Sequence, residues 1–198
     1  MRLSRTLAAV AAALTLTLAG CASSESSADP SGFNDADVDF ATDMIQHHAQ
    51  ALVMVDMTMG RDLDPEMVEL TEEIRAAQAP EIEQMADWLE DWDQPVPQTS
   101  RDHANAHADD HGGDDGAQMD ADMPGMMSAE EMDALEDASG EEFRTMWLEM
   151  MIEHHQGAVE MAETVVEEGQ NGEVRALAED VIRTQSDEIS TMQDLLEG

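Results

Sequence analysis

The chain has 198 residues, of which 46 are Asp or Glu and only 8 are basic, and its formal net charge is −38. A charge of this sign and size repels a phosphate backbone and attracts cations, so nucleic acid is excluded as a partner. Every basic residue is Arg, and the chain has 1 Cys and 0 Tyr, which excludes an intramolecular disulfide bond and a tyrosyl radical.

The N-terminal residues 1–20 have the pattern of a signal peptide. Two arginines precede an apolar segment, residues 7–18, that is too short to span a bilayer stably. The sequence Leu-Ala-Gly-Cys at residues 18–21 resembles the lipobox of bacterial lipoproteins, and this resemblance implies that Cys21 is lipidated and becomes the first mature residue. Residues 21–33 would then be a flexible tether that holds the domain at the outer face of the cell membrane. The alternative is an ordinary secretory signal in which Cys21 has no role.

Two helices are predicted in the first half of the chain. Apolar residues recur at helical spacing over residues 33–59 and again over residues 64–92. Asp64, followed directly by proline, is a favourable start for the second helix. Pro80 lies inside that helix, and it predicts a kink or a short break near residues 76–79.

A low-complexity insert, residues 94–127, follows these helices. It is rich in Asp, Gly and His, and no hydrophobic core can be built from it, so we expect a disordered linker. Its His and Met side chains lie in an acidic segment with nothing to pack on, and as an alternative they form a weak metal-collecting arm. The residues of this candidate arm are His103, His107, His111, Met119, Met123, Met126 and Met127.

The second half of the chain predicts three helices. A short helix follows the capping box that begins at Ser128, a long helix runs from Ser139 to Gly169, and a last helix follows the turn at Asn171. No segment alternates apolar and polar residues over the length of a strand. The sequence therefore predicts an all-α fold.

The two halves are copies of each other. The sequence Met-Ile-Gln-His-His at residues 44–48 returns as Met-Ile-Glu-His-His at residues 151–155. When residues 40–89 are placed on residues 147–196 without a gap, 15 of 50 positions are identical. A match of this length indicates a tandem duplication.

The duplication predicts the architecture of the domain, which we place at residues 34–197. Repeat 1 spans about residues 34–93 and repeat 2 about residues 128–197. Each repeat would form an antiparallel helical hairpin with one apolar face, and the two hairpins would bury these faces against each other. The result is a four-helix bundle with a long crossover.

The repeated motif is the strongest candidate for a functional site. Each copy places one thioether and two imidazoles within one helical turn, and the hairpin lengths bring a Gln and a Glu of the second helix opposite each copy. We therefore predict a metal site whose ligands are His47, His48, His154, His155, Met44 and Met151. The residues that would orient the imidazoles or add further ligands are Gln78, Glu81, Gln185, Glu188, Met54 and Met161. The alternative is a structural network of buried polar residues that fixes the register of the bundle.

The ligand types favour copper over iron. Thioether and imidazole without thiolate suit Cu(I) or Ag(I), although another transition metal is an open alternative. Di-iron bundles use Glu-x-x-His, but Met44 and Met151 stand three positions before His47 and His154. A dinuclear oxidase or ferroxidase is therefore the second hypothesis. The third is a structural or interaction module of the cell envelope that binds no metal, and no catalytic residue is predicted.

The chain resembles the bacterial exported family called "domain of unknown function 305". The resemblance covers about residues 36–197 and rests on Met-Ile-x-His-His followed by Ala and Met, on Gln-x-x-Glu-Ile-x-x-Met, and on Met-Pro-Gly-Met-Met at residues 123–127. It implies a ferritin-like four-helix bundle. Because some family members are implicated in copper binding and copper tolerance, it also implies that the His-His motifs bind copper. We expect a lipid-anchored, extracytoplasmic protein that sequesters or hands on Cu(I).

Overall fold

A computed structural model of the protein describes residues 32–99 and 123–198. Within these ranges helices are the only regular secondary structure, and the predicted all-α four-helix bundle is confirmed. The helices are α1 (Asp35–Asp56), α2 (Pro65–Asp91), α4 (Ala129–Asp137), α5 (Gly140–Glu168) and α6 (Gly172–Glu197). The predictions for the signal peptide, for Cys21, and for His103, His107, His111 and Met119 lie outside the described residues.

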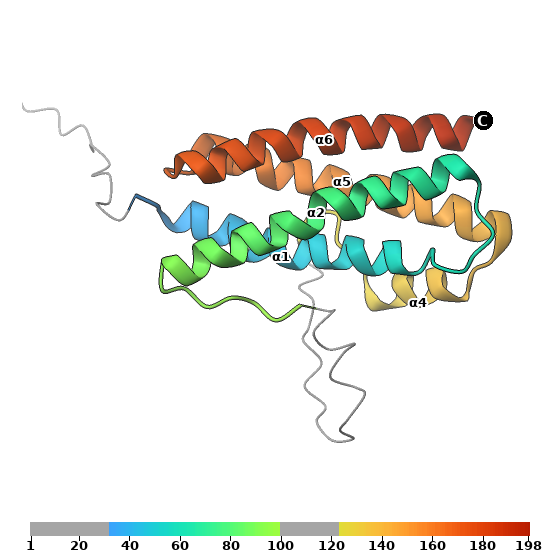
Figure 1. The fold of residues 1–198 in the computed structure, drawn as a ribbon, viewed down its shortest axis with the longest axis horizontal. Coiled ribbons are helices and arrows are strands. Elements are labelled where there is room, and N and C mark those ends of the chain that lie inside the picture. The colour runs from blue at the N-terminus through green and yellow to red at the C-terminus, as the bar shows by residue number, and fades with distance from the viewer. Residues whose placement is uncertain (1–31, 100–122) are drawn as a thin grey trace, which may run out of the picture.

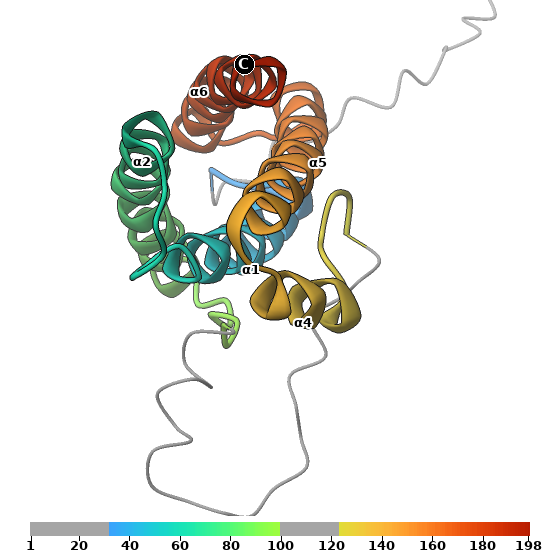
Figure 2. The same ribbon diagram turned by 90° about the vertical axis from the view of Figure 1, so that its right-hand side faces the viewer.

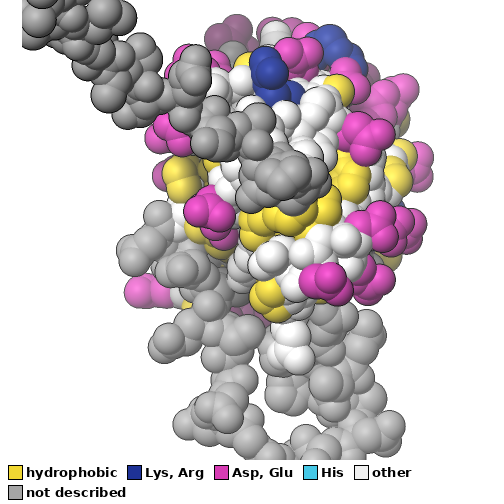
Figure 3. Space-filling view, turned by 90° about the vertical axis from the view of Figure 1, so that its left-hand side faces the viewer, with side chains coloured by type: hydrophobic (Ala, Val, Ile, Leu, Met, Phe, Trp, Pro, Cys, Tyr) yellow, Lys and Arg dark blue, Asp and Glu magenta, His cyan; other side chains and the backbone are white. Residues whose placement is uncertain are grey.

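The four long helices form two antiparallel hairpins around a common core (Figures 1 and 2). α1 packs against α2, α5 packs against α6, and the two hairpins meet chiefly along α1 and α5. The short helix α4 lies outside the four and contacts α5. Asp and Glu dominate the charged surface at the end of the bundle shown in Figure 3. Among the helices that the structure describes, none is both long enough and apolar enough to cross a bilayer.

The helix starts follow from local capping residues. Asn34 and Ser128 each form a capping box with the acidic residue three positions later. Asp64 and Asn171 accept backbone N–H groups of the first turns of α2 and α6. Ser139 occupies the predicted N-cap of α5, but its side chain makes no capping hydrogen bond. These caps satisfy backbone donors that the first turn of a helix leaves free.

Helix α2 runs without interruption through Pro80, so the break considered near residues 76–79 does not occur. A proline removes one backbone donor from the helix and crowds the preceding turn. Ile74 and Met85, which are both 0% exposed, anchor the helix in the core on either side of the proline. Burial of both halves explains why the helix continues.

Hydrogen bonds at the two ends of the bundle join the two hairpins. The carboxylate of Asp37 in α1 accepts the backbone N–H of Asn171 at 3.0 Å, in the turn between α5 and α6. At the other end of the bundle, Arg144 of α5 donates to Asp64 at 3.1 Å and to the carbonyl of Leu195 at 2.6 Å. Because these contacts lie at opposite ends of the bundle, the two hairpins cannot slide along each other without breaking one of them.

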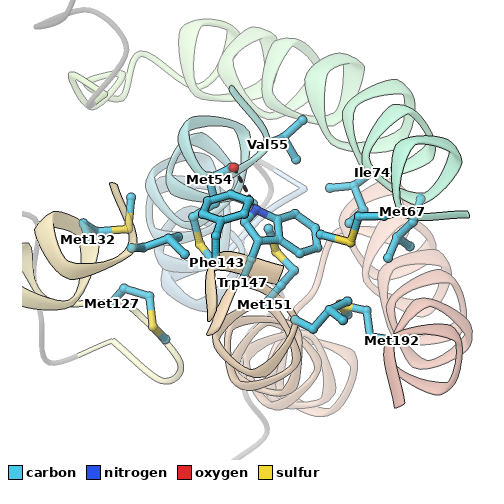
Figure 4. Packing of buried hydrophobic residues seen from close by; sticks show 14 of the residues in the cluster. Met54, Val55, Met67, Ile74, Met127, Met132, Phe143, Trp147, Met151 and Met192 are labelled. Carbon is cyan, nitrogen blue, oxygen red and sulfur yellow. Dashed lines mark hydrogen bonds between the residues drawn. The ribbon is translucent and has the colours of Figure 1, made fainter. Parts of the chain in front are cut away.

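The apolar core is divided along the bundle axis into two clusters. The first surrounds Trp147, whose indole N–H donates to the carbonyl of Met54 at 2.8 Å (Figure 4). The second surrounds Phe40 and includes Met85 of α2 and Val181 of α6. Each long helix contributes residues to both clusters. In each of them, buried His or Gln residues lie between the residues of the first cluster and those of the second. The core therefore contains a polar layer that all four long helices cross.

The end of the predicted insert belongs to the core, which corrects the prediction that no core can be built from residues 94–127. Met126 and Met127 are only 8% and 3% exposed. The Gln50 amide donates to the carbonyl of Met127 at 2.8 Å, and the N–H of Met127 donates to Gln50 at 2.7 Å. Burial of two thioethers and this paired hydrogen bond fix the segment. Met126 and Met127 would have to leave the core to act in a metal-collecting arm, whereas Met123 is half-buried.

Candidate metal centre

The polar layer consists of the repeated histidines and the glutamines that face them. Its histidines are 0% exposed, and its glutamines are 1% and 2% exposed. The members are His47 and His48 of α1, Gln78 of α2, His154 and His155 of α5, and Gln185 of α6. The structure thus brings both copies of the motif, 107 positions apart in the sequence, into a single layer.

One imidazole of each motif copy is held by a carboxylate from the paired helix. His48 Nε2 lies 2.7 Å from Glu81, and His155 Nε2 lies 2.8 Å from Glu188. The glutamates are only partly accessible, with 16% and 12% of their side chains exposed. A carboxylate accepts, so Nε2 of each ring donates, and Nδ1 is the nitrogen that can offer a lone pair to a metal ion. These contacts confirm that Glu81 and Glu188 face the motif, as the hairpin lengths predict.

The other imidazole of each copy lies at the centre of the bundle. The rings of His47 and His154 contact each other, with centroids 3.7 Å apart and planes inclined by 40°. His47 Nε2 donates to the carbonyl of Pro124 at 3.0 Å. For His154, neither ring nitrogen has a hydrogen-bond partner among the described residues. The central pair is therefore asymmetric, although the two histidines are repeat counterparts.

Burial keeps the central pair neutral. Desolvation, reinforced by the neighbouring His48, lowers the pKa of His47 from 6.5 to about 3. The pKa of His154 is also well below its usual value, first because of desolvation and then because of the surrounding histidines. Neutral imidazoles are the form that binds metal ions, so no proton has to be displaced from these rings at neutral pH.

The layer contains a concentration of unsatisfied polar atoms. Within residues 32–99 and 123–198, the atoms without a partner are Nδ1 of all four histidines, Nε2 of His154, both amide atoms of Gln78 and Oε1 of Gln185. Buried polar atoms are nearly always paired, and each one left unpaired costs about 1–3 kcal/mol. Several free lone pairs in one layer therefore need an explanation, and a bound ion would supply it.

The donor set fits a soft or borderline metal ion. Histidines that bind metals commonly donate their second N–H to a carboxylate or a backbone carbonyl. His48 and His155 do so to glutamates, and His47 does so to Pro124. In the described part of the chain no three His, Cys, Asp or Glu side chains already converge as a metal-binding group. The ring of His154, which contacts that of His47, would have to turn for its lone pair to reach an ion bound at the layer.

The predicted thioether ligands lie on opposite sides of the layer. Met44 is buried in the Phe40 cluster, whereas Met151 and Met54 are buried in the Trp147 cluster (Figure 4). This follows from the antiparallel course of α1 and α5, which places the residue before each His pair on a different side. Met161 does not reach the layer, since it lines a surface groove of about 350 Å³ beside Phe40.

Sequence reasoning missed three residues that border the layer, namely Gln50, Pro124 and Gly157. The segment from Pro124 to Met127 crosses α1 and α5 beside the central histidines, with the Pro124 carbonyl at His47 and the Met127 backbone at Gln50. A Cβ atom on Gly157 would lie 2.0 Å from the Pro124 carbonyl oxygen. Gln50 and Gly157 occupy equivalent repeat positions. The mismatch of a glutamine with a glycine inside a well-matched motif is the signal that could have revealed this contact.

Comparison with known proteins places these features in a family. The family model described as "Domain of unknown function (DUF305)" matches residues 37–196. A DUF305 fragment from Deinococcus radiodurans is 31% identical, with 83% of this chain and 97% of that chain covered and a TM-score of 0.66. A putative secreted DUF305 protein from Streptomyces coelicolor is 33% identical, with 82% and 92% covered and a TM-score of 0.67.

A third similar structure has bound metal. CopM in a Cu(II)-bound form is 31% identical, with 81% of this chain and 95% of that chain covered and a TM-score of 0.62. CopM has also been solved in Cu(I)-bound and Ag-bound forms. A search of curated proteins gives no match.

Proposed function

Because this chain belongs to the DUF305 family and is similar to CopM, which has been solved with bound copper and with bound silver, we propose that it binds copper in its polar layer. The ion is Cu(I), and the protein sequesters it or hands it on. The observation that carries this proposal is the set of buried, unpartnered imidazole nitrogens in the layer as the structure describes it. His47, His48, His154 and His155 are the nitrogen ligands.

The chemistry of the layer suits Cu(I) better than a harder ion. Neutral imidazoles and thioethers are soft or borderline donors, and Met44 and Met151 flank the layer, one from each side. Glu81 and Glu188 hold the rings of His48 and His155 and keep Nδ1 free for the ion. The strongly acidic surface raises the local concentration of cations around the protein. CopM, with a similar fold, supports this choice through its Cu(I)-bound form.

The proposed location is the outer face of the cell membrane. The signal-like N-terminus ends at Cys21, which would carry the lipid, and the tether that follows would hold the bundle away from the bilayer. The similar protein from Streptomyces coelicolor, whose description is "putative secreted protein", supports export. Labelled fatty acid should enter the wild-type protein and not a Cys21→Ala variant. Equal labelling of both would rule out the anchor.

A dinuclear redox centre is the second candidate function. The observation that favours it is the symmetric pair of His–Glu contacts, one from each repeat. A centre with one ion at each His–Glu pair would oxidise Fe(II) or Cu(I), with dioxygen as the electron acceptor. Oxygen uptake that continues after the two ions of such a centre have been supplied would show turnover and would support this function over sequestration.

Competition titration of Cu(I) tests the binding proposal. The wild-type protein and a variant with His47, His48, His154 and His155 all changed to Ala are titrated against a Cu(I) chelator. The wild type should compete with the chelator, and the variant should not. A control in which His103, His107 and His111 become Ala should still compete. If the quadruple variant remains helical and binds as tightly as the wild type, copper is not bound in the layer.

A further inference from the structure

The segment Pro124–Met127, which we name the strap, crosses the outside of the α1–α5 pair at the level of the central histidines. It is pressed closely against α5, since a Cβ atom on Gly125 would lie 2.5 Å from the carbonyl oxygen of Glu153. Gly125 also has φ of +73°, a conformation that favours glycine. At its far end, two hydrogen bonds join the strap to Gln50 of α1.

The strap breaks the symmetry of the duplication. α1 and α5 cross the polar layer in opposite directions, so the repeats are related by an approximate two-fold axis near the contact of His47 with His154. A segment that crosses this axis leaves no room for its own symmetry copy. The repeat positions beside it have therefore diverged, with Gln50 holding the backbone of Met127 and Gly157 leaving space for Pro124.

The asymmetry also makes the hydrogen bonds of the two central histidines different. His47 donates its Nε2–H to the strap carbonyl of Pro124 at 3.0 Å, which leaves Nδ1 as its only lone pair when the ring is neutral. His154, its counterpart, has no partner at either nitrogen within the described residues. One ring is thus fixed in orientation and tautomer, whereas the other is restrained only by packing.

We propose that the strap positions the metal site by fixing His47 with its proton on Nε2 and its lone pair on Nδ1, and that Gln50 and Gly157 are the positioning residues. This inference rests on the proposed copper-binding function. It assigns unequal roles to the two central histidines: His47 presents one preset nitrogen, and His154 turns to complete the ligand set. Partners that orient a ligating histidine typically change metal affinity by about 10–100-fold when removed.

The tautomer of His47 tests the inference without metal. Side-chain ¹H–¹⁵N correlation spectra of the full chain distinguish a protonated Nε2 from a protonated Nδ1. The metal-free wild type should show His47 protonated on Nε2. Gly157→Ala, which forces Pro124 away, and Gln50→Ala, which releases Met127, should both shift His47 toward a mixture of tautomers. Gly172→Ala and Gln156→Ala are matched controls, because Gly172 has open space around it and Gln156 is exposed.

The outcomes are separable from those of the function itself. Loss of the preset tautomer with Cu(I) binding weakened about 10–100-fold in the two strap variants supports the whole inference. A wild type that shows the preset tautomer and binds no copper contradicts the proposed function and leaves the strap contact standing. If His47 in the wild type is protonated on Nδ1, or if Gln50→Ala leaves both the tautomer and the affinity unchanged, the strap does not position the site. If Gly157→Ala does not fold, the wild-type spectrum and Gln50→Ala still decide.

Discussion

The rings of His47 and His154, which come from equivalent positions of the two repeats, lie in contact at the centre of the bundle with centroids 3.7 Å apart. Two separate sites, one in each hairpin, would keep these rings apart. Their contact means that both copies of the motif contribute to one layer between the Trp147 and Phe40 clusters. A metal ion bound to either ring would be within reach of the other, so we expect the repeats to bind metal together.

The central histidines should make the metal-free protein sensitive to mild acid. The pKa of His47 is about 3 in the folded state and 6.5 in the unfolded state. The unfolded chain therefore binds the extra proton between these values. Above pH 6.5 the ring is neutral in both states and does not change the free energy of unfolding. As the pH falls from 6.5 toward 3, the free energy of unfolding decreases by up to about 1.4 kcal/mol per pH unit for each proton.

Urea unfolding between pH 7.5 and pH 4.5 measures this dependence. A His47→Gln, His154→Gln variant should show a shallower loss of unfolding free energy with falling pH, since the carboxylates contribute equally to both proteins. Parallel curves for the variant and the wild type would show that the central rings are not held neutral by burial.

Replacing Gln78 should separate stability from binding. Its amide is 1% exposed and has no partner for either polar atom in the described part of the chain. Gln78→Leu should therefore stabilise the metal-free protein by about 1–3 kcal/mol, because a buried unpaired group is removed. It should weaken copper binding if the amide contributes to the site. Gln185→Leu, where only Oε1 is unpaired, should give a smaller gain in a denaturation curve. A loss of stability in Gln78→Leu would mean that the amide is hydrogen-bonded in solution.

The thioethers beside the layer should matter for metal affinity and little for folding. Met44→Leu and Met151→Leu conserve volume in well-packed surroundings, and we expect each to cost less than about 1.5 kcal/mol of stability. Cu(I) affinity should fall clearly in both, because a soft ligand is lost. Met67→Leu, in the Trp147 cluster and away from the layer, is the control. Equal Cu(I) affinity in all three variants would exclude Met44 and Met151 as ligands.

Arg61 should be the arginine on which the fold depends most. It donates to the carbonyls of Met57, Ala138 and Glu136 at 2.7, 2.6 and 3.0 Å, and its guanidinium lies 3.7 Å from the ring centre of Phe143. Lysine cannot reproduce this planar set of donors. Arg61→Lys should lower the free energy of unfolding by about 1–3 kcal/mol, whereas Arg183→Lys, at an exposed ion pair, should change it by less than about 1 kcal/mol. Similar losses for both variants in urea titrations would contradict this role.

The parts of the structure that could be predicted from the sequence depend on local patterns and on the duplication. Capping residues such as Asp64 and Ser128 set the helix starts. Matched hairpin lengths were sufficient to place Glu81 and Glu188 opposite the motif, because antiparallel helices joined by a short turn have few possible registers. Export, lipidation and the copper ligands stay predictions.

The strap could not be predicted, because its stability comes from contacts distant in sequence. Residues 123–127 contain no helical pattern, and their composition suggests a linker. Their place in the core depends on Gln50, 77 residues before Met127, and on the space left by Gly157. Neither residue type signals such a role by itself. Pro80 failed to break α2 for a similar reason, since burial on both sides outweighs the local cost.

Silver titration of ¹⁵N-histidine-labelled protein tests the central claim most directly, because Ag(I) resembles Cu(I) in its ligand preference and couples to a bound nitrogen in NMR spectra. The first additions of Ag(I) should produce silver–nitrogen coupling at imidazole nitrogens of the layer, with Nδ1 of His47 and His154 among them. Coupling confined to His103, His107 and His111, with the spectra of His47, His48, His154 and His155 unchanged, would contradict a metal site in the bundle.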